Sequence, residues 1–340
     1  MKSKLAVFIF ILINISFDIY AQDPIYSQFY YNKLDLNPAF AGNEGNSSGK
    51  IRLNAYNRNL FLPIRGPFNS QNASIDIGLC KFPIGIGFIV SNEFQGDGNY
   101  RITKFDGIIS VNIPLMGTQR LSIGLKSGII NQYIDWNEFI FSDQLNPIYG
   151  VVSQSSNTGN VIDNSIVNNW TAGLKYYNFD SKKIEYSIGV VASNLFEPAI
   201  GFLNRSILPR RYTAHFIIKL RKKGNTEEKS YRLSIRADKQ NSFITSIIIA
   251  EYYFDKSFSL GVGARLSFFN DNAFKNTSSF SVFAGWQPKD NIKVIVSYET
   301  NIGGINLLGA GNSFELGFNY LFPKSFCKKR SAYIDCPNSQ

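Results

Sequence analysis

His215 is the only histidine in the chain and the side chain best suited to acid–base chemistry. An imidazole can serve as a general base near neutral pH, and hydrolases place it beside a carboxylate or a serine nucleophile. No nucleophile motif and no cluster of carboxylates accompanies His215. A single histidine is also a poor basis for a metal site. We therefore expect no catalytic residues, no cofactor and no metal, and a structural hydrogen bond for His215.

Two consecutive arginines, Arg210 and Arg211, could bind a carboxylate group. The planar guanidinium group of arginine presents several donors in a fixed geometry that matches a carboxylate. The carboxylate could belong to a partner protein. Alternatively, it could belong to the chain itself, and Glu197 and Asp143 are candidates. The sequence favours the second interpretation, with the ion pair facing the interior.

A long segment between strand-like stretches, Asp135–Ser165, carries four aromatic residues among acidic and asparagine residues: Trp136, Phe139, Phe141 and Tyr149. Loops of this length without structure of their own are uncommon unless they are functional. Aromatic side chains often anchor protein interfaces. The segment is thus predicted to be a docking surface for a partner, or else a lid folded into the interior.

The N-terminus has the form of a secretory signal peptide. Lys2 and Lys4 precede the apolar stretch Leu5–Phe17, and Ala21 provides a small residue for cleavage before Gln22. The apolar stretch is shorter than the roughly 20 residues that a membrane-spanning helix needs. We expect residues 1–21 to be removed and the mature protein to be exported.

Export bears on the cysteines. Cys327 and Cys336 lie in the C-terminal segment and could form a disulfide bond in an oxidising compartment. Free thiols are an equally good interpretation. Zinc binding is disfavoured, because this segment contains no histidine.

Composition predicts a transmembrane β-barrel. Aromatic residues make up 15% of the chain and charged residues 18%, below the roughly 25% of soluble domains. After the signal there is no second long apolar stretch, and barrel strands keep the mean hydropathy low because they alternate apolar and polar residues. A secreted β-sandwich is the competing class. The net charge of +10 is scattered, so we expect outer-membrane lipid as a contact and no nucleic acid.

Period-two alternation predicts fourteen strands. They are expected at Gly49–Asn59, Gln71–Cys80, Pro83–Asn92, Lys104–Leu115, Gln119–Ile134, Ile166–Phe179, Lys183–Asn194, Arg210–Leu220, Ser230–Asp238, Asn241–Phe254, Ser257–Phe268, Ser278–Gln287, Asn291–Thr300 and Asn312–Phe322. The connections alternate between short and long, as the periplasmic turns and outer loops of outer-membrane barrels do. Two of these strands, near Ile84–Val90 and Ile244–Ala250, are apolar and do not alternate cleanly, which fits small or apolar partners in the lumen or a plug that covers one of them.

The segment before the first strand is predicted to be that plug. Its aromatic residues, including Tyr26, Phe29 and Tyr30, are too many to leave in water, and turn residues at Asn37–Pro38 and Gly42 would let it double back. We expect it in the periplasmic half of the lumen.

Several blocks resemble one known family. The segment Gln22–Gly42 (QDPIYSQFYYNKLDLNPAFAG), together with Leu121–Gly150, Ile188–His215, Ser281–Phe322 and the Cys336–Pro337 pair, is similar to the PorP/SprF proteins of the type IX secretion and gliding machinery of Bacteroidota. The resemblance implies an all-β outer-membrane barrel without enzymatic activity. It also implies a role in the secretion or surface anchoring of a large adhesin-type protein that carries a type IX C-terminal secretion domain, alongside other type IX components.

The expected organisation is a signal peptide at 1–21, a leader and plug at 22–48, a barrel at 49–322 and a periplasmic tail at 323–340. The alternative function is a passive porin or a channel for hydrophobic solutes.

Overall fold

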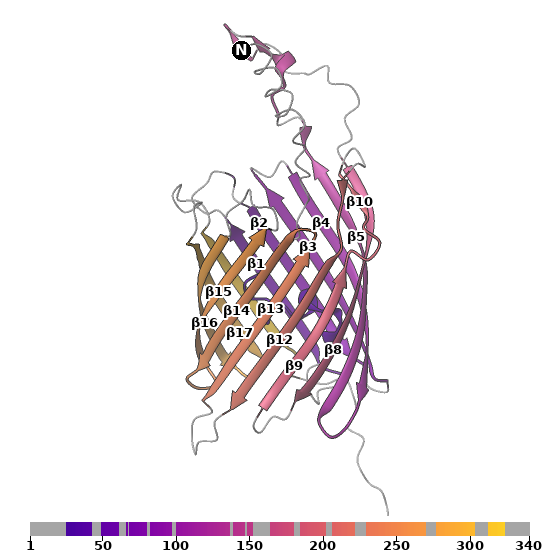
Figure 1. Cartoon of the computed structure of the whole chain (residues 1–340), viewed down its shortest axis with the longest axis vertical. Helices are drawn as coiled ribbons and strands as arrows, with labels where there is room; N and C mark the ends of the chain where they lie inside the picture. The colour runs from indigo at the N-terminus through magenta and orange to yellow at the C-terminus, as the bar shows by residue number, and fades with distance from the viewer. Residues whose placement is uncertain are drawn as a thin grey trace, which may run out of the picture.

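The computed structural model describes residues 25–42, 49–60, 66, 68–79, 82–96, 100–136, 139–146, 148–151, 164–179, 184–201, 206–221, 229–269, 277–302 and 312–323. Fourteen antiparallel strands close into a barrel in which each strand pairs with its neighbours along the chain and the first strand pairs with the last (Figure 1). They are β1 (Ile51–Leu60), β2 (Phe68–Gly78), β3 (Ile84–Gln95), β4 (Tyr100–Pro114), β5 (Gln119–Ile134), β8 (Asn164–Phe179), β9 (Ile184–Ser193), β12 (Arg211–Arg221), β13 (Ser230–Gln240), β14 (Phe243–Tyr253), β15 (Phe258–Phe269), β16 (Thr277–Lys289), β17 (Ile292–Asn301) and β18 (Ser313–Leu321).

Alternation of the side chains explains why this sequence forms a closed wall. In β2, for example, Ser74 and Asp76 are buried toward the lumen, whereas Ile75 between them is 42% exposed on the outer surface. Closure gives the backbone of every strand a partner on each side, which a lipid environment requires. The predicted number of strands and the barrel are confirmed. Among the described residues there is no helix long and apolar enough to cross a membrane.

The two long connections contain short structures that the sequence did not predict. Between β5 and β8 lie a 3-10 turn, η3 (Ser142–Gln144), and a small hairpin of β6 (Leu145–Asn146) and β7 (Gly150–Val151). Between β9 and β12 lies a second hairpin of β10 (Ala199–Ile200) and β11 (Ser206–Ile207). Figure 1 shows that, at the end of the barrel with the long connections, the β4–β5 side rises beyond the rest of the rim, with β10 beside β5.

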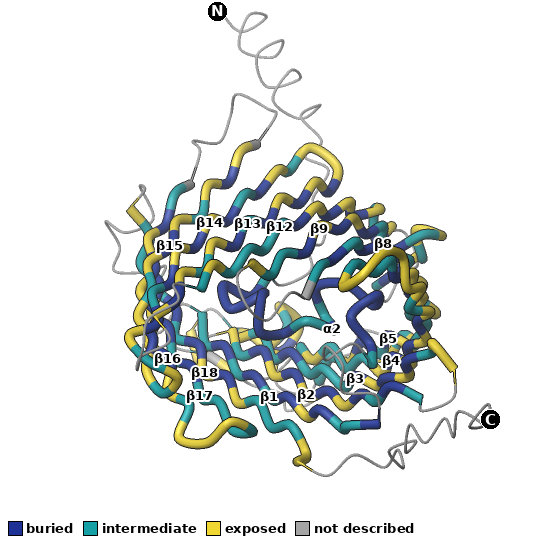
Figure 2. Tube along the Cα trace, turned by 90° about the horizontal axis from the view of Figure 1, so that it is seen from below, coloured by how far each residue is buried: buried dark blue, intermediate teal, exposed yellow. Residues whose placement is uncertain are grey.

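The segment that precedes β1 lies inside the barrel. Its described part, residues 25–42, contains one turn of helix, α2 (Lys33–Leu36), and a 3-10 turn, η1 (Pro38–Phe40). Seen along the barrel in Figure 2, this buried segment (dark blue) occupies the lumen and is surrounded by strands. We call residues 25–42 the lumen segment.

Candidate functional site

The lumen segment has an apolar core of its own. Phe29, Tyr30 and Leu34 are at most 2% exposed, and they pack against inward side chains of the wall. The wall residues in this cluster include Ile89 of β3 and Ile247 and Ile249 of β14. These belong to the two strands whose alternation is not clean in the sequence. The three isoleucines point inward because the lumen segment covers them.

Asn37 and Pro38 form a tight turn that lies against two glycines of the wall. A Cβ atom added at Gly124 would overlap the backbone of Pro38 and Ala39, and one at Gly173 would overlap the side chain of Asn37. The Asn37 side chain accepts a hydrogen bond from the Ala39 amide at 2.9 Å and donates to the Leu174 carbonyl at 3.1 Å. Glycine therefore lets the wall and the turn approach more closely than any side chain would allow.

His215 lies at this same turn. Its Nε2 atom is 3.1 Å from the side-chain amide nitrogen of Asn37, and the centre of its ring is 5.4 Å from that of Phe40. Because an amide NH₂ group only donates, Nε2 is the acceptor here and the imidazole is neutral. The histidine thus takes part in a contact between the wall and the lumen segment.

The C-terminal end of the lumen segment is bound near the end of the barrel that carries the short turns. Gly42 has a left-handed backbone with φ of 65°, and its amide donates to Asp76 at 2.7 Å. Asp76 also forms an ion pair with Arg52 at 2.8 Å, and Arg52 donates to the Phe40 carbonyl at 3.1 Å. The Arg52–Asp76 ion pair of the wall thus binds two backbone groups of the lumen segment, the Gly42 amide and the Phe40 carbonyl.

The other end of the lumen segment is held by buried carboxylates. Both oxygens of Glu315 accept hydrogen bonds from backbone amides, from Ser27 at 2.8 Å and from Gln28 at 2.9 Å. The Ser27 hydroxyl donates to Glu299. Arg58 lies 3.3 Å from Glu315 and donates to the Ile25 carbonyl. Hydrogen bonds to ionised groups are stronger than neutral ones, so this end is firmly bound.

A third group of polar contacts surrounds Tyr31. Its hydroxyl group lies 2.9 Å from Glu251 and 2.8 Å from the hydroxyl of Tyr253. Burial raises the pKa of the Tyr31 phenol well above its ordinary value, so the phenol stays protonated and can donate. Lys293 and Arg232 lie 4.3 and 5.1 Å from the centre of its ring. Cation–π contacts of this kind are favourable when shielded from water.

The position of the lumen segment differs from the predicted one. Gly42 lies beside Gly78 and Gly85, which flank the short β2–β3 turn. Ser27, in contrast, contacts Glu299, which lies near the end of β17 that leads into a long connection. The segment therefore extends from the short-turn end into the half near the long loops, and the prediction of the periplasmic half alone was too narrow. Buried carboxylates of the wall hold it there.

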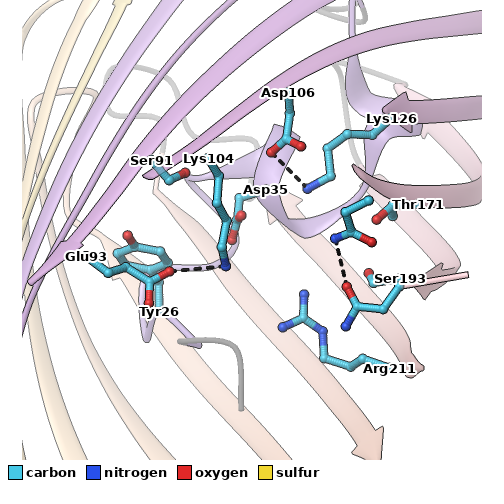
Figure 3. A pocket seen from close by; sticks show the side chains of 12 residues that line it. Tyr26, Asp35, Ser91, Glu93, Lys104, Asp106, Lys126, Thr171, Ser193 and Arg211 are labelled. Atoms are coloured by element: carbon cyan, nitrogen blue, oxygen red, sulfur yellow. Dashed lines mark hydrogen bonds and ion pairs between the residues drawn. The ribbon is translucent and has the colours of Figure 1, made fainter. Parts of the chain in front are cut away.

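A small cavity of about 40 Å³ remains beside the lumen segment (Figure 3). Lys104 and Glu93 form an ion pair across part of it at 3.2 Å, and Lys126 lies 3.8 Å from Asp106. Asp35 of α2 also lines it. This volume can hold a few water molecules. It is far too small for a peptide.

The aromatic residues of the β5–β8 connection lie at the long-loop end. The described part of this connection (magenta in Figure 1) stands beyond the rim and does not fold into the lumen. The Trp136 ring lies 5.9 Å from Phe139 and 6.3 Å from Phe141, so the three rings form a cluster. Ile148 and Tyr149 are 83% and 79% exposed at the tip. We call residues 136–151 the rim finger.

Arg210 and Arg211 lie in different surroundings. Arg210 is exposed and forms an ion pair with Glu197 at 3.6 Å within the β9–β12 connection. Arg211 faces the lumen, where it lies 4.0 Å from Asp238. The intramolecular pairing with Glu197 is therefore present, but on the surface and not in the lumen. Only Arg210 of the two is accessible to a partner.

Cys327, Cys336 and residues 1–21 are outside the described residues. Within the described ranges, no group of three or more His, Cys, Asp or Glu side chains is arranged to hold a metal ion.

The chain resembles several solved barrels at low identity. The CymD monoaromatic hydrocarbon channel aligns with a TM-score of 0.48 and 11% identity over 91% of this chain and 95% of that one. The Ralstonia pickettii toluene transporter TbuX gives 0.46 and 8%, over 86% and 94%. The Pseudomonas putida toluene transporter TodX gives 0.46 and 8%, over 90% and 99%.

Sequence comparison is more specific. No curated protein matches the chain. The family described as type IX secretion system membrane protein PorP/SprF matches residues 19–320.

Proposed function

Since the chain belongs to the PorP/SprF family of type IX secretion system membrane proteins, we propose that it is a non-enzymatic outer-membrane barrel that supports the export or surface anchoring of a secreted, adhesin-type protein. The partner carries a type IX C-terminal secretion domain and is encoded next to this chain. Other type IX components and outer-membrane lipid are its remaining contacts.

The observation that carries this proposal is the occupied lumen. The lumen segment is bound at three separate places, by Asp76 and Arg52, by Glu315 and Arg58, and by Glu251. Each involves a buried charge, and removing one partner of a buried pair is strongly unfavourable. A barrel filled in this way is better suited to binding at its rim than to passing solutes.

The rim finger is the best candidate for the docking surface. Ile148 and Tyr149 are exposed at its tip, and the cluster of Trp136, Phe139 and Phe141 forms its base. Connections outside the hydrogen-bonded wall can carry binding residues without disturbing the barrel. Large aromatic side chains are frequent at the energetic centre of interfaces.

The test is a pull-down of the secreted protein encoded by the neighbouring gene, from detergent extracts of cells. Replacement of Trp136 and Phe139 by alanine should reduce its recovery strongly, while the barrel keeps its heat-modifiable migration on gels. Equal recovery from wild type and double variant would exclude the rim finger. The periplasmic tail with Cys327 and Cys336 would then be the next surface to test.

Planar bilayers separate this function from the alternative. A filled barrel should show little conductance, whereas a passive porin should conduct ions steadily without any partner. Steady conductance of the purified wild-type chain would favour the porin and contradict the proposed role of the lumen segment.

A further inference from the structure

One strand of the wall is longer than the neighbour that should cover it. β8 pairs with β5 along its whole length, up to the pair Tyr133–Asn164. Its pairing with β9 stops at Thr171–Ser193. Residues 164–170 therefore have a strand on one side only, among the residues that the structure describes. Because both backbone groups of Trp170 are already hydrogen-bonded, six residues remain, which correspond to an edge of roughly 20 Å.

The ladder geometry identifies the backbone groups on this edge. In an antiparallel strand, the N–H and C=O of one residue point to the same side, and successive residues alternate. The Trp170 carbonyl accepts a hydrogen bond from Leu195, just after β9, so Trp170 points to the β9 side. By alternation, Asn168, Ile166 and Asn164 point to the same side. Their backbone groups face the open edge.

The chain turns away from this edge for local reasons. Asn194, directly after β9, has a left-handed backbone with φ of 57°, and Glu197 has φ of 45°. Pro198 follows and has no N–H group to offer a ladder. The chain then forms the β10–β11 hairpin, whose Ile200 and Leu208 are buried with Ile130 and pack near Val167.

That packing uses the inner face of the sheet. Ile130 is buried on the same side of β5 as Ser122 and Gly124, which face the lumen. The hairpin therefore covers the inner face near the rim, and none of the described strands pairs with β8 on its other side at residues 164–170.

The edge lacks the features that normally protect such strands. Natural edge strands carry charges, prolines or bulges that prevent unwanted pairing. The sequence of residues 164–170 is NSIVNNW, without a charged residue, a proline or a glycine. Ile166 is 63% exposed on the outer face, and Trp170 lies 6.4 Å from the exposed ring of Phe196. An added strand would find both hydrogen-bonding groups and apolar side chains here.

The edge also lies beyond the apolar band of the barrel. Across the sheet from Ile166, the outward residues in register are Asn131 of β5 and Thr103 of β4. A row with polar residues is expected near the water interface and not in the apolar band, and open backbone groups are tolerated at that interface. The edge is thus accessible to a protein outside the membrane, on the same rim as the rim finger.

We propose that the open edge of β8 at Asn164–Asn169 binds an extended segment of the secreted partner as an added β-strand. Its recognition is by main-chain hydrogen bonds, and the segment is uncharged, with apolar residues at the positions that face Ile166 and Trp170. This inference rests on the proposed function and names the contact that would hold the partner.

A proline substitution tests the edge directly. Asn168→Pro removes one N–H that points to the open edge and none that pairs with β5, and edge positions of this kind tolerate proline. Asn168→Ala changes the same side chain but keeps the N–H. The probe is the purified C-terminal secretion domain of the neighbouring secreted protein, and its affinity for each barrel is measured in detergent. We expect Asn168→Pro to weaken binding about tenfold, and Asn168→Ala to have little effect.

A second variant guards against misfolding. Ile166→Lys leaves the backbone unchanged and adds the kind of charge that protects natural edges, so it should also weaken binding. All variants should keep heat-modifiable migration. If Asn168→Pro and Ile166→Lys both bound the probe with the affinity of the wild type, the edge proposal would be overturned and the proposed function would stand.

Two further results have distinct meanings. Absence of any binding by the wild-type barrel would contradict the proposed function itself. A wild-type dimer that Asn168→Pro converts to a monomer, with unchanged partner affinity, would show that the edge pairs two copies of this chain, and this would also overturn the proposal.

Discussion

The side-chain amide nitrogen of Asn37 lies 3.1 Å from Nε2 of His215, and this contact joins the turn of the lumen segment to the middle of β12. A buried hydrogen bond contributes about 1 kcal/mol, and the coupling between its partners is measured by a double-mutant cycle. We expect Asn37→Ala and His215→Ala to destabilise the barrel, with a coupling energy of about 1 kcal/mol in urea unfolding. Simple additivity of the two effects would show that the contact contributes nothing.

The glycine cradle under the turn gives a second prediction. Gly124→Val should push Pro38 and Ala39 away from the wall, because a side chain there would overlap their backbone. Single-channel recording should then detect conductance that the wild type lacks. Gly107→Ala is the control, since its Cβ would lie 3.8 Å from the nearest neighbouring atom, the Ser127 carbonyl oxygen. Identical traces for wild type and Gly124→Val would argue against a plug held at this turn.

Buried and exposed carboxylates should differ sharply in their effect on stability. Glu315→Ala removes the carboxylate that lies 3.3 Å from Arg58 and the acceptor of two backbone amides, and removal of one buried partner costs about 3 kcal/mol or more. Glu185→Ala removes the partner of Arg221 at a half-exposed site, which should cost less than about 1 kcal/mol. Urea midpoints of the two variants provide the comparison, and similar midpoints would mean that Glu315 does not hold the segment.

The tip of the rim finger is expected to contribute to binding but not to folding. Ile148→Ser combined with Tyr149→Ser should lower partner affinity by roughly thirtyfold, as loss of about 2 kcal/mol implies. Met116→Ser is the control, because Met116 is 81% exposed in the turn between β4 and β5 at the opposite end. Affinity for the purified partner is measured by titration. A larger loss from Met116→Ser would place the contact at the other rim.

Much of the wall could be predicted because its pattern is local. Gln119–Ile134 was expected as a strand and is β5 with the same bounds. The other thirteen strands differ from their predicted bounds by only a few residues, since alternation of apolar and polar residues marks both the strand and its faces. β3 and β14 alternate less regularly, because inward isoleucines of both strands pack against a segment from elsewhere in the chain.

The contacts of the lumen segment could not be predicted, because they join residues that are far apart in the sequence. Glu315 and Gln28 are 287 positions apart, and nothing in the local sequence of β18 indicates that its glutamate accepts from the leader. The two small hairpins were missed as well, because pairs of two-residue strands have no recognisable periodicity. The separation of Arg210 from Arg211 follows from alternation at the start of β12, which sends consecutive side chains to opposite sides.

The lumen segment also bears on the order in which the protein is assembled. Its binding groups come from strands at both ends of the chain, from Arg52 on β1 to Glu315 on β18, and these two strands form the seam that closes the barrel. Contacts between such distant positions form late in folding, because the intervening chain must first be ordered. The binding site for residues 25–42 is therefore complete only when the seam has closed. Insertion of this segment distinguishes a finished barrel from an open sheet, and a protease that cleaves only the unbound segment would shorten the N-terminal end of chains that fail to close.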